Sequence, residues 1–466
     1  MDGQGTEHAS RLSRRRFAQA TGAAALTAAS WRRVWGANER IGIGVIGYGL
    51  IGQMHVADFK EQPDVNMVAV AETHRGRMDR CVEVCGRPMA RYADFRKLLE
   101  DKNVDAVLVS TPDHWHALMM MLACAAGKDV YVEKPLTLFV REGRWMADVA
   151  KRHNRVVQVG TQQRSGPHYA QARQLIRDGR LGQIVSVRDS FYRNIFPGFG
   201  IPPDQDPPAE LDWDMFLGPA PMRPYNPHRG VYHFRWFWDT SGGQLTNLGM
   251  HSLDIVHWLL DLRGPQAVYS AGGRRFLKDN CETPDVQDAI IEYPGFSVVF
   301  SIRECSQGSG AFDPLAFYGT NGLLTLTRDT LVVAPDALTP AVNTIPGIRG
   351  GHPVGGPQYV PQTGRPKMRT DAVREGPGFE SQLLKRHARN FLDCIKSRQT
   401  PVSDLESCHR VATSLHLANL SLRLGGRRIA WDAEKEEILG DPEAAAMLVR
   451  PYRKPWDAEL GSLNVS

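Results

Sequence analysis

The feature that most constrains the fold is a glycine-rich turn near the start of this 466-residue chain. Residues 41–52 read IGIGVIGYGLIG, so an apolar run leads into closely spaced glycines, and the helical pattern LIGQMHVADF follows. A buried strand, a tight turn and a helix, in this order, form the unit from which parallel sheets are built. The N-terminal part of the chain is therefore expected to adopt an α/β fold.

Four more apolar stretches follow before residue 163, namely VNMVAVAE, DAVLVST, DVYVE and RVVQVGTQ. The residues between them carry helical patterns. Near-continuous apolar strands that are joined through helices indicate a parallel sheet covered on both faces. We therefore expect a Rossmann domain with a parallel sheet over residues 38–163.

The pattern changes after residue 164. A helical stretch, HYAQARQLIRDG, precedes alternating strands that are joined by tight turns such as YPGF and GTNG. Alternation with short turns favours antiparallel pairing. Residues 164–466 are therefore expected to form a second α/β domain with a mostly antiparallel open sheet, C-terminal helices and a tail. Within it, residues 336–378 are rich in proline and glycine and are expected to form a long surface loop or lid.

The glycine-rich turn has the spacing of a dinucleotide site, with the motif Gly47, Tyr48, Gly49, Leu50, Ile51 and Gly52. The three glycines would permit, in order, the tight turn, the approach of a pyrophosphate and the packing of the helix on the strand. Glu72 ends the second strand, at the distance from Gly52 where an acid would bind both ribose hydroxyls and repel a 2′-phosphate. NAD is the predicted cofactor. NADP is the weaker alternative, because Arg75 and Arg77 could receive a phosphate.

Positive charge is concentrated at the N-terminus. The formal net charge is +5, and six arginines lie from Arg11 to Arg33, so the remainder is near neutral and nucleic acid is not an expected partner. The stretch SRRRF, residues 13–17, precedes an Ala-rich run and resembles a twin-arginine export signal; an amphipathic helix with a basic flank is the alternative. We expect residues 1–37 to be this signal and the protein to be exported to the periplasm or another extracytoplasmic site. The apolar run is too short for stable membrane insertion.

Polar side chains follow two later strands of the first domain. The stretch TPDHWH supplies Thr111 and His116, and VYVEKP supplies Glu133 and Lys134. In open parallel sheets, ligands bind beyond the carboxyl ends of the strands, so these groups should face the nicotinamide crevice. A surface lysine is the alternative for Lys134. The predicted cofactor contacts in this region are Thr111, His116, Glu133 and Gln163.

Three motifs together resemble the Gfo/Idh/MocA oxidoreductase family. They are the glycine motif, the stretch TPDHWH with AGKDVYVEKP, and the pattern GGxxxNxGxHxxD from residue 242. The resemblance covers essentially the whole chain from residue 40 onward. It implies a Rossmann domain followed by an α/β domain whose open sheet faces the cofactor and often mediates oligomers, so a homo-oligomer through that sheet is expected. It also implies oxidation or reduction of a sugar or polyol carbon with NAD(P).

The resemblance also assigns catalytic roles. It places Lys134 beside the nicotinamide, matches His251 to the histidine of the substrate-domain helix, and puts Asn247 where the family usually has Asp. Oxidation of a secondary alcohol needs a base for the hydroxyl proton, which imidazole can be, so His251 is the expected base and Lys134 the donor to the reacting oxygen. Asn247 cannot stabilise an imidazolium as a carboxylate would, so a lowered pKa is expected for His251. A helix histidine without a catalytic role is the alternative.

An aromatic and basic cluster precedes that helix. Tyr232, Arg235 and Trp236 are of types that stack on sugar C–H surfaces or bind hydroxyls, and with Arg164 they are the predicted substrate contacts. An aromatic-rich core strand is the alternative. No acid or cysteine stands at ligand spacing from the histidines, so no metal site is predicted.

Three functions remain open at the level of sequence. The favoured prediction is an NAD-dependent oxidoreductase that acts on a secondary hydroxyl of a sugar, polyol or sugar derivative. Its nicotinamide would be tightly held, because free NAD should be scarce outside the cytoplasm. One alternative is an NAD-dependent glycoside hydrolase in which oxidation, elimination, hydration and reduction leave no net redox change. The other is a non-catalytic protein that binds sugar or NAD. In each case the expected partner is a small carbohydrate.

Overall fold

The computed structural model describes residues 40–230, 232–308, 314–338, 347–349, 352–354, 367–379 and 382–465. The expected signal segment, residues 1–37, and most of the expected loop, residues 336–378, lie outside these ranges. Both therefore stay predictions.

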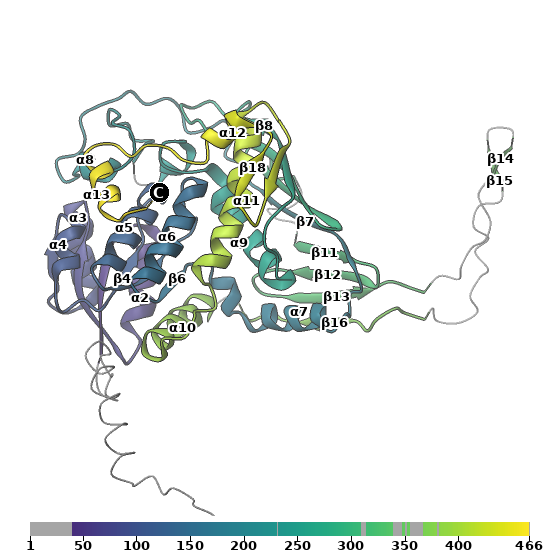
Figure 1. Ribbon diagram of the computed structural model, residues 1–466, viewed down its shortest axis with the longest axis horizontal. Coiled ribbons are helices and arrows are strands. Elements are labelled where there is room, and N and C mark those ends of the chain that lie inside the picture. Colours follow the sequence, from purple (N-terminus) through teal and green to yellow (C-terminus); the bar gives the residue numbers. More distant parts are fainter. Residues whose placement is uncertain are drawn as a thin grey trace, which may run out of the picture. The chain divides into compact units, whose positions relative to one another are not determined.

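The first sheet contains six parallel strands in the order β3-β2-β1-β4-β5-β6 (Figure 1). The five apolar stretches singled out above all form strands, so the predicted parallel sheet is confirmed. The short edge strand β3 was not predicted, because its three residues are only partly buried and show no apolar run. The strands are β1 (Ile41–Ile46), β2 (Val65–Ala71), β3 (Ala90–Tyr92), β4 (Ala106–Val109), β5 (Asp129–Val132) and β6 (Val157–Val159).

Helices connect these strands and cover the sheet. Every residue of β1, β4 and β5 is buried, which requires cover on both faces and explains why these strands are apolar throughout. The connecting helices are α2 (Leu50–Lys60), α3 (Arg75–Cys85), α4 (Phe95–Glu100), α5 (Asp113–Ala125) and α6 (Val140–Arg152).

The second sheet has ten strands in the order β16-β13-β12-β11-β7-β10-β9-β8-β17-β18, and β7 with β10 is its parallel pair. The mostly antiparallel sheet that the tight turns predicted is confirmed. Its strands are β7 (Ile184–Tyr192), β8 (Ala267–Gly273), β9 (Val286–Tyr293), β10 (Phe296–Arg303), β11 (Leu315–Gly319), β12 (Gly322–Leu326), β13 (Leu331–Pro335), β16 (Val373–Glu375), β17 (Ile429–Asp432) and β18 (Glu437–Leu439). Two further short strands, β14 (Gly347–Arg349) and β15 (His352–Val354), pair with each other.

One face of the second sheet is buried under helices, and α9 and α11 lie side by side across it (Figure 1). Strand β9 accordingly alternates between buried and more exposed positions, and most of β10 alternates between buried and half-buried ones. The helical segments of this part of the chain are η1 (Gln162–Ser165), α7 (Pro167–Arg177), α8 (Trp213–Leu217), η2 (His233–Trp236), α9 (Gly243–Leu260), α10 (Leu383–Ser397), α11 (Leu405–Arg423), α12 (Pro442–Ala446) and α13 (Trp456–Ser462).

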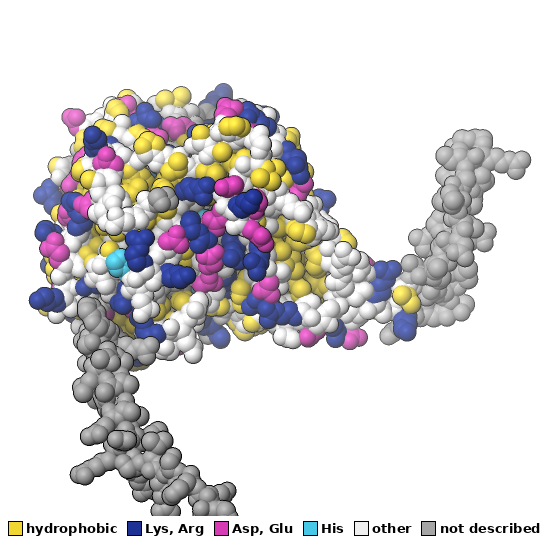
Figure 2. Space-filling view, in the orientation of Figure 1, with side chains coloured by type: hydrophobic (Ala, Val, Ile, Leu, Met, Phe, Trp, Pro, Cys, Tyr) yellow, Lys and Arg dark blue, Asp and Glu magenta, His cyan; other side chains and the backbone are white. Residues whose placement is uncertain are grey.

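The other face of this sheet carries exposed apolar side chains. Tyr269 and Ile290 are direct cross-strand neighbours on β8 and β9, with 40% and 39% of their surface exposed, and Tyr318 on β11 is 40% exposed. On the side of the molecule turned to the viewer in Figure 2, hydrophobic side chains are visible over strands β11 to β13.

The C-terminal elements return to the first sheet. Phe391 of α10 packs edge-on against Phe59 of α2 and Tyr131 of β5, and α11 packs on α6 as well as on α9. Trp456 of α13 stacks on Phe95 and meets Trp115 edge-on. The chain therefore crosses from one sheet to the other near residue 163 and crosses back. Among the described residues, no helix combines the length and the apolarity that spanning a membrane requires.

Candidate functional site: a dinucleotide groove and a lysine–asparagine contact

The glycine-rich turn is built as the motif requires. Gly47 has φ +88°, and a Cβ there would lie 2.9 Å from the carbonyl oxygen of Ser110. A Cβ on Gly52 would lie 2.5 Å from the carbonyl oxygen of Gly47, so only glycine lets α2 pack this closely on the turn. Gly49 has open space where its side chain would be, and no side chain of the described residues caps the start of α2. The turn therefore leaves both room and a helix N-terminus for an anion.

Glu72 lies at the mouth of this turn, just beyond the end of β2. Its carboxylate accepts hydrogen bonds from the backbone N–H of Tyr48 at 2.6 Å and of His74 at 3.1 Å, and from the hydroxyl of Thr73 at 3.2 Å. The predicted link between the motif and this acid thus corresponds to direct contact in the fold. The carboxylate is held beside the motif, where it can accept further bonds from a ribose.

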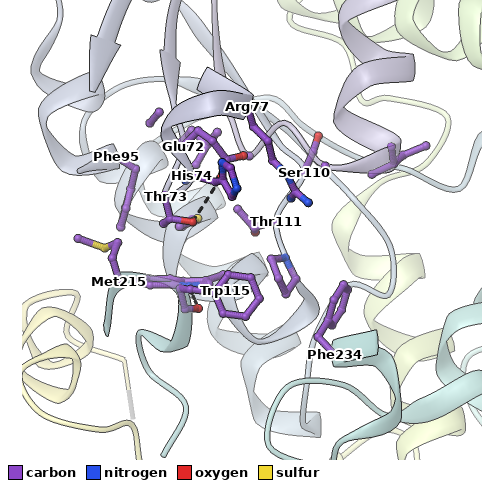
Figure 3. A pocket seen from close by; sticks show the side chains of 18 of the residues that line it. Glu72, Thr73, His74, Arg77, Phe95, Ser110, Thr111, Trp115, Met215 and Phe234 are labelled. Atoms are coloured by element: carbon purple, nitrogen blue, oxygen red, sulfur yellow. Dashed lines mark hydrogen bonds between the residues drawn. The ribbon is translucent and has the colours of Figure 1, made fainter. Parts of the chain in front are cut away.

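A cavity with an empty volume of about 1150 Å³ contains both features (Figure 3). One wall is polar, with Glu72, His74, Arg77 and Thr111, and another is aromatic, with Phe95 and Trp115. Gly47, Gly49, Leu50 and Ile51 also line it, whereas Tyr48 and Gly52 are not among the lining residues. Within the described part of the chain, the hydroxyls of Ser110 and Thr111 are buried without a hydrogen-bond partner. Open space at Gly49, an uncapped helix and unpaired hydroxyls fit a dinucleotide.

A segment of the second domain covers this groove. Residues 208–218, which we call the covering segment, pair with the backbone after β2: Asp212 N donates to Thr73 O at 2.9 Å, and Arg75 N donates to Glu210 O at 3.0 Å. The indole of Trp115 donates to Phe216 O at 3.0 Å. Leu211, Met215 and Phe216 thereby become part of the cavity wall. The covering segment could not be predicted from the sequence, because most of its contacts are made to backbone atoms and require no particular side chain.

The second centre lies where α9 meets the end of β5. Nζ of Lys134 donates to both the carbonyl oxygen and the side-chain Oδ1 of Asn247, each at 2.9 Å. His251 lies one helical turn further on α9, on the same face as Asn247. The structure therefore brings together the predicted lysine of the first domain and the predicted asparagine and histidine of the second.

Both titratable groups of this centre have lowered pKa values. Burial, helped by the charge of Arg235 and opposed by Glu133, lowers the pKa of Lys134 to about 8. Burial, with the charges of Lys134 and Arg328, lowers the pKa of His251 well below its usual value. At neutral pH, Lys134 is thus mostly an ammonium and His251 a neutral imidazole. This is the pairing of a hydrogen-bond donor and a proton acceptor that alcohol oxidation needs.

His251 borders a second cavity, between α9 and the second sheet. The lining includes Gln163, Tyr169, Ser190, Phe300 and Arg328. Nδ1 of His251 is buried and has no hydrogen-bond partner among the residues that the structure describes. An unpaired imidazole nitrogen beside a cavity is suited to binding a hydroxyl group.

Three of the predicted cofactor contacts, Thr111, His116 and Gln163, lie in three different places. Thr111 lines the groove. The ring of His116 lies between the carbonyl oxygens of Pro135 and Thr111, at 2.6 and 2.9 Å, and so braces two strand ends. Gln163 donates to the hydroxyl of Tyr169 at 2.6 Å and lines the cavity of His251 instead of the groove.

Glu133, the fourth, is engaged inside the protein. Its Oε1 lies 2.6 Å from His55 Nε2, and its Oε2 accepts from the backbone N–H of Lys134 at 2.9 Å. Gly160 makes room for it, since a Cβ there would collide with Oε1. Burial opposes its charge, yet the bond from His55 and the charge of Lys134 keep the pKa of Glu133 below its usual value. Glu133 is thus bound to His55 and to the backbone, and it is not among the residues that line the groove.

Two of the four predicted substrate residues have structural partners instead. Arg164 is buried and pairs with Asp254 of α9, with Nε to Oδ2 at 2.8 Å. Trp236 is fully buried, and its indole donates to Glu304 at 2.6 Å. Both side chains are bound to partners inside the protein, which residue type alone does not reveal, and a role in binding substrate stays a prediction. The cluster forms a 3-10 helix instead of the core strand that was the alternative.

The other two predicted substrate residues, Tyr232 and Arg235, line the dinucleotide groove. Phe234, their neighbour in the chain, also lines the groove and enters it from the second domain (Figure 3). Among the described residues, no group of three or more histidine, cysteine or acidic side chains is arranged to hold a metal ion.

The matches to family models agree with this architecture. Residues 41–161 match the model described as an oxidoreductase family with an NAD-binding Rossmann fold. Residues 171–295 and 377–458 match the C-terminal alpha/beta domain of the same family. The chain belongs to the Gfo/Idh/MocA oxidoreductase family. The groove around Gly49 and Glu72 is accordingly the NAD site of this family member.

Individual relatives cover parts of this Gfo/Idh/MocA protein. A scyllo-inositol 2-dehydrogenase (NAD(+)) of Bacillus subtilis is 30% identical over 238 residues, which are 50% of this chain and 57% of that protein. A glycosyl hydrolase family 109 protein 1 of Shewanella sp. (strain ANA-3) is 32% identical over 155 residues, 32% of this chain and 34% of that protein. The chain thus matches little more than half of the first and about a third of the second.

Solved structures extend the likeness over most of the fold. The structure of a levoglucosan dehydrogenase in complex with NADH and levoglucosan has a TM-score of 0.63 with 18% identity, and the match covers 84% of this chain and 99% of that one. At this level of identity the likeness concerns the fold.

Proposed function

We propose that this family member is an NAD-dependent oxidoreductase that acts on a secondary hydroxyl of a sugar, a polyol or a sugar derivative. The observation that carries the proposal is the contact of Lys134 with Asn247, one helical turn from His251. It joins the two domains at the carboxyl edge of the first sheet, beside the NAD groove. The inositol and levoglucosan dehydrogenases among the similar proteins act on this class of hydroxyl.

The side chains supply what the reaction needs. NAD, when bound, accepts the hydride from the alcohol carbon. His251 is neutral at physiological pH and lines the second cavity, where its imidazole can take the hydroxyl proton. Lys134 is left with one N–H beyond the two that Asn247 accepts, and this N–H can bind the reacting oxygen. The Lys134 charge then favours alkoxide character.

We also propose that the cofactor stays bound between turnovers. The supporting observation is the covering segment, whose backbone bonds at Thr73 and Arg75 would have to break to open the groove on that side. Purified protein that is denatured with acid should release close to one NAD(H) per chain, measured by mass spectrometry. Recovery of empty protein that also ignores added NAD would rule out retention.

A redox-neutral glycoside hydrolase is the second candidate, and the observation that favours it is the 32% identity to the glycosyl hydrolase family 109 protein. Oxidation at C3 of the sugar acidifies the C2–H bond, loss of that proton expels the glycosidic oxygen, and water adds to the resulting double bond. Return of the hydride to C3 then restores the original oxidation state, so NAD is not consumed. The same base and the same lysine would serve both reactions.

Product masses separate these two reactions. Incubation with a panel of free sugars, polyols and glycosides should give a product two hydrogens lighter if the protein is a dehydrogenase. Cleavage of a glycoside without net redox change would instead establish the hydrolase. A third possibility, a non-catalytic binding protein, would be supported if no compound of the panel were turned over. If Lys134→Ala left all measurable turnover intact, the catalytic assignment of Lys134 would be wrong.

Export through the twin-arginine route is part of the proposal and rests on residues 13–17. In cells, replacing Arg14 and Arg15 by lysine should leave the protein in the cytoplasm, whereas the wild-type chain should fractionate with the periplasm. Equal fractionation of the two proteins would contradict export by this route.

We further propose a homo-oligomer through the exposed apolar side chains of the second sheet, with Tyr269→Ser expected to lower the molar mass measured by light scattering. A wild-type monomer would refute this.

A further inference from the structure

A chain of side-chain hydrogen bonds leads away from Lys134 into the protein. Lys134 Nζ donates to Asn247 Oδ1 at 2.9 Å, Asn247 Nδ2 donates to Gln244 Oε1 at 2.9 Å, and Gln244 Nε2 donates to Glu304 Oε1 at 3.0 Å. Gln244 and Asn247 lie one turn apart on α9, and Glu304 directly follows β10. Two amides thus connect an ammonium to a carboxylate.

The direction of every bond in this chain is fixed by its ends. An ammonium can only donate and a carboxylate can only accept, so both amides must present oxygen toward Lys134 and nitrogen toward Glu304. Amides that are polarised in one direction strengthen each other's hydrogen bonds. The charge of Glu304 can therefore be felt at Lys134 across two neutral side chains.

Glu304 is held in place from several sides. It is fully buried, its Oε1 also accepts from Nε of Arg193 at 2.8 Å, and its Oε2 accepts from the indole of Trp236 at 2.6 Å. Because Arg193 lies against the carboxylate, the field of this ion pair is weak at a distance. Any influence on Lys134 must therefore travel mainly through Gln244 and Asn247.

Other charges also face Lys134. They are Glu133 from the end of β5, Asp113 from the start of α5, Arg235 from η2 and Arg328 from the loop after β12, with the neutral His251 on α9. All of them remain in place when Gln244 or Glu304 is replaced. Their effect on the pKa of Lys134 is therefore the same whether or not the hydrogen-bond chain is intact.

We propose that Glu304 is a positioning residue that acts on Lys134 through Gln244 and Asn247, and so supplies the negative end that an aspartate at position 247 would supply directly. This inference deepens the proposed function, because it rests on Lys134 lying at the reacting oxygen. It explains how an amide serves at position 247. Asn247 passes the influence of Glu304 to Lys134 and at the same time aims the ammonium.

The experiment measures the pKa of Lys134 directly. In holoprotein labelled with [ε-13C]lysine, the pH dependence of the Lys134 carbon shift gives this pKa, and Lys134→Met assigns the signal. In Glu304→Gln, the pKa should fall by about one unit, because the ammonium loses its distant anion. Gln244→Met keeps the charge of Glu304 but breaks the chain, and the same fall is expected.

Two further variants serve as controls. Gln287→Met removes another buried glutamine, which bonds Ser270 and Asn419, and it should leave the pKa of Lys134 unchanged. Asn247→Asp places a carboxylate directly on Lys134 and should raise the pKa. In that background the added Gln244→Met should have no effect, because aspartate cannot donate to Gln244 and the chain is already broken.

The outcomes are distinct. A fall in Glu304→Gln without one in Gln244→Met would show that the charge acts through space, and no fall in either would also overturn the proposal. If Gln244→Met does not fold, as judged by its melting curve, Glu304→Gln compared in the wild-type and Asn247→Asp backgrounds decides the same point. If the pKa of Lys134 shifts as expected but Lys134→Met leaves turnover intact, the coupling through the hydrogen bonds is supported and the proposed function is wrong.

Discussion

Lys134 links the two domains through a side-chain hydrogen bond. It extends from the strand end that carries Glu133, which is turned away toward His55, and it reaches Asn247 on the other domain. The alternation of side chains along an extended segment separates the two neighbours, so one is anchored in the first domain and the other faces the second.

The lowered pKa values predict the shape of the pH profile. Because the pKa of Lys134 is lowered to about 8, its ammonium form is lost above that pH, and kcat/KM for hydroxyl oxidation should fall there. The pKa of His251 lies well below its usual value, so the neutral base is present throughout the neutral range and no acid limb is expected near the ordinary histidine pKa. Steady-state rates across this range test both points. A rate that rises through the pKa of Lys134 would instead make its neutral amine the active form.

We expect Glu72 to set the preference between NAD and NADP. Replacing it with serine removes the acceptor for the ribose and the repulsion of a 2′-phosphate, while Arg77 remains in the cavity to receive one. Affinity for NAD should fall by about tenfold and the preference should shift toward NADP. Calorimetric titration of cofactor-free protein measures this, with Glu83→Ser on the exposed side of α3 as the control. An unchanged ratio of affinities would show that Glu72 does not select the cofactor.

At the scale of elements, α9 carries most of the second domain's contribution to the site. Its N-terminal turn supplies Gln244 and Asn247, and its middle supplies His251. Asp254, one turn further, pairs with Arg164 and so fixes the helix to the segment that links the two sheets. The position of His251 therefore depends on a buried ion pair that takes no part in the chemistry.

Breaking this ion pair should cost much more than breaking a surface pair on the same helix. Asp254→Asn leaves the buried Arg164 with only the more distant carboxylate of Asp404, at 3.9 Å, and the free energy of unfolding should fall by about 3 kcal/mol. Asp261→Asn at the exposed end of α9 loosens pairs with Arg173 and Arg177 and should cost less than about 1 kcal/mol. Urea denaturation of both variants provides the comparison. Equal losses would mean that the buried pair contributes no more than the surface one.

Sequence patterns predicted the elements better than they predicted contacts. The glycine motif, its distance to Glu72 and the strand end at Lys134 are local features with fixed geometry, and each lies where it was expected. The surroundings of Arg164 and Trp236 could not be predicted, because residue type does not reveal the buried partners, Asp254 and Glu304, that they contact. The covering segment has no periodicity, and Glu304 is far from Lys134 along the chain, so neither could be placed without the fold.

At the scale of the whole molecule, the C-terminal end supports the cofactor groove from behind. Trp456 of α13 packs on Phe95 and Trp115, whose side chains form the aromatic wall of the groove. Arg96 also pairs with Glu459 of the same helix. The last helix of the described chain therefore stabilises a wall built by the first domain.

Trp456→Ala should loosen that wall. Removing a buried tryptophan should lower the stability by about 3 kcal/mol, and the cofactor should leave faster because Phe95 and Trp115 lose their backing. The rate at which NAD appears in the filtrate during repeated dilution measures this loss. Trp258→Ala on α9 is the control, since Trp258 is partly exposed and lies under Arg173 away from the groove. Equal retention in both variants would contradict a supporting role for α13.

We propose that a hydride passes from a ring carbon of a sugar or polyol to NAD in the groove, with Lys134 at the reacting oxygen. The most direct measurement uses holoprotein, a panel of inositols, hexoses and glycosides with deuterium on the ring carbons, and mass spectrometry of the nicotinamide after a rapid quench. We predict deuterium on the nicotinamide with at least one of these compounds, and at least about 100-fold slower transfer in Lys134→Met. Absence of deuterium with every compound, or equal transfer in the variant, would contradict the claim.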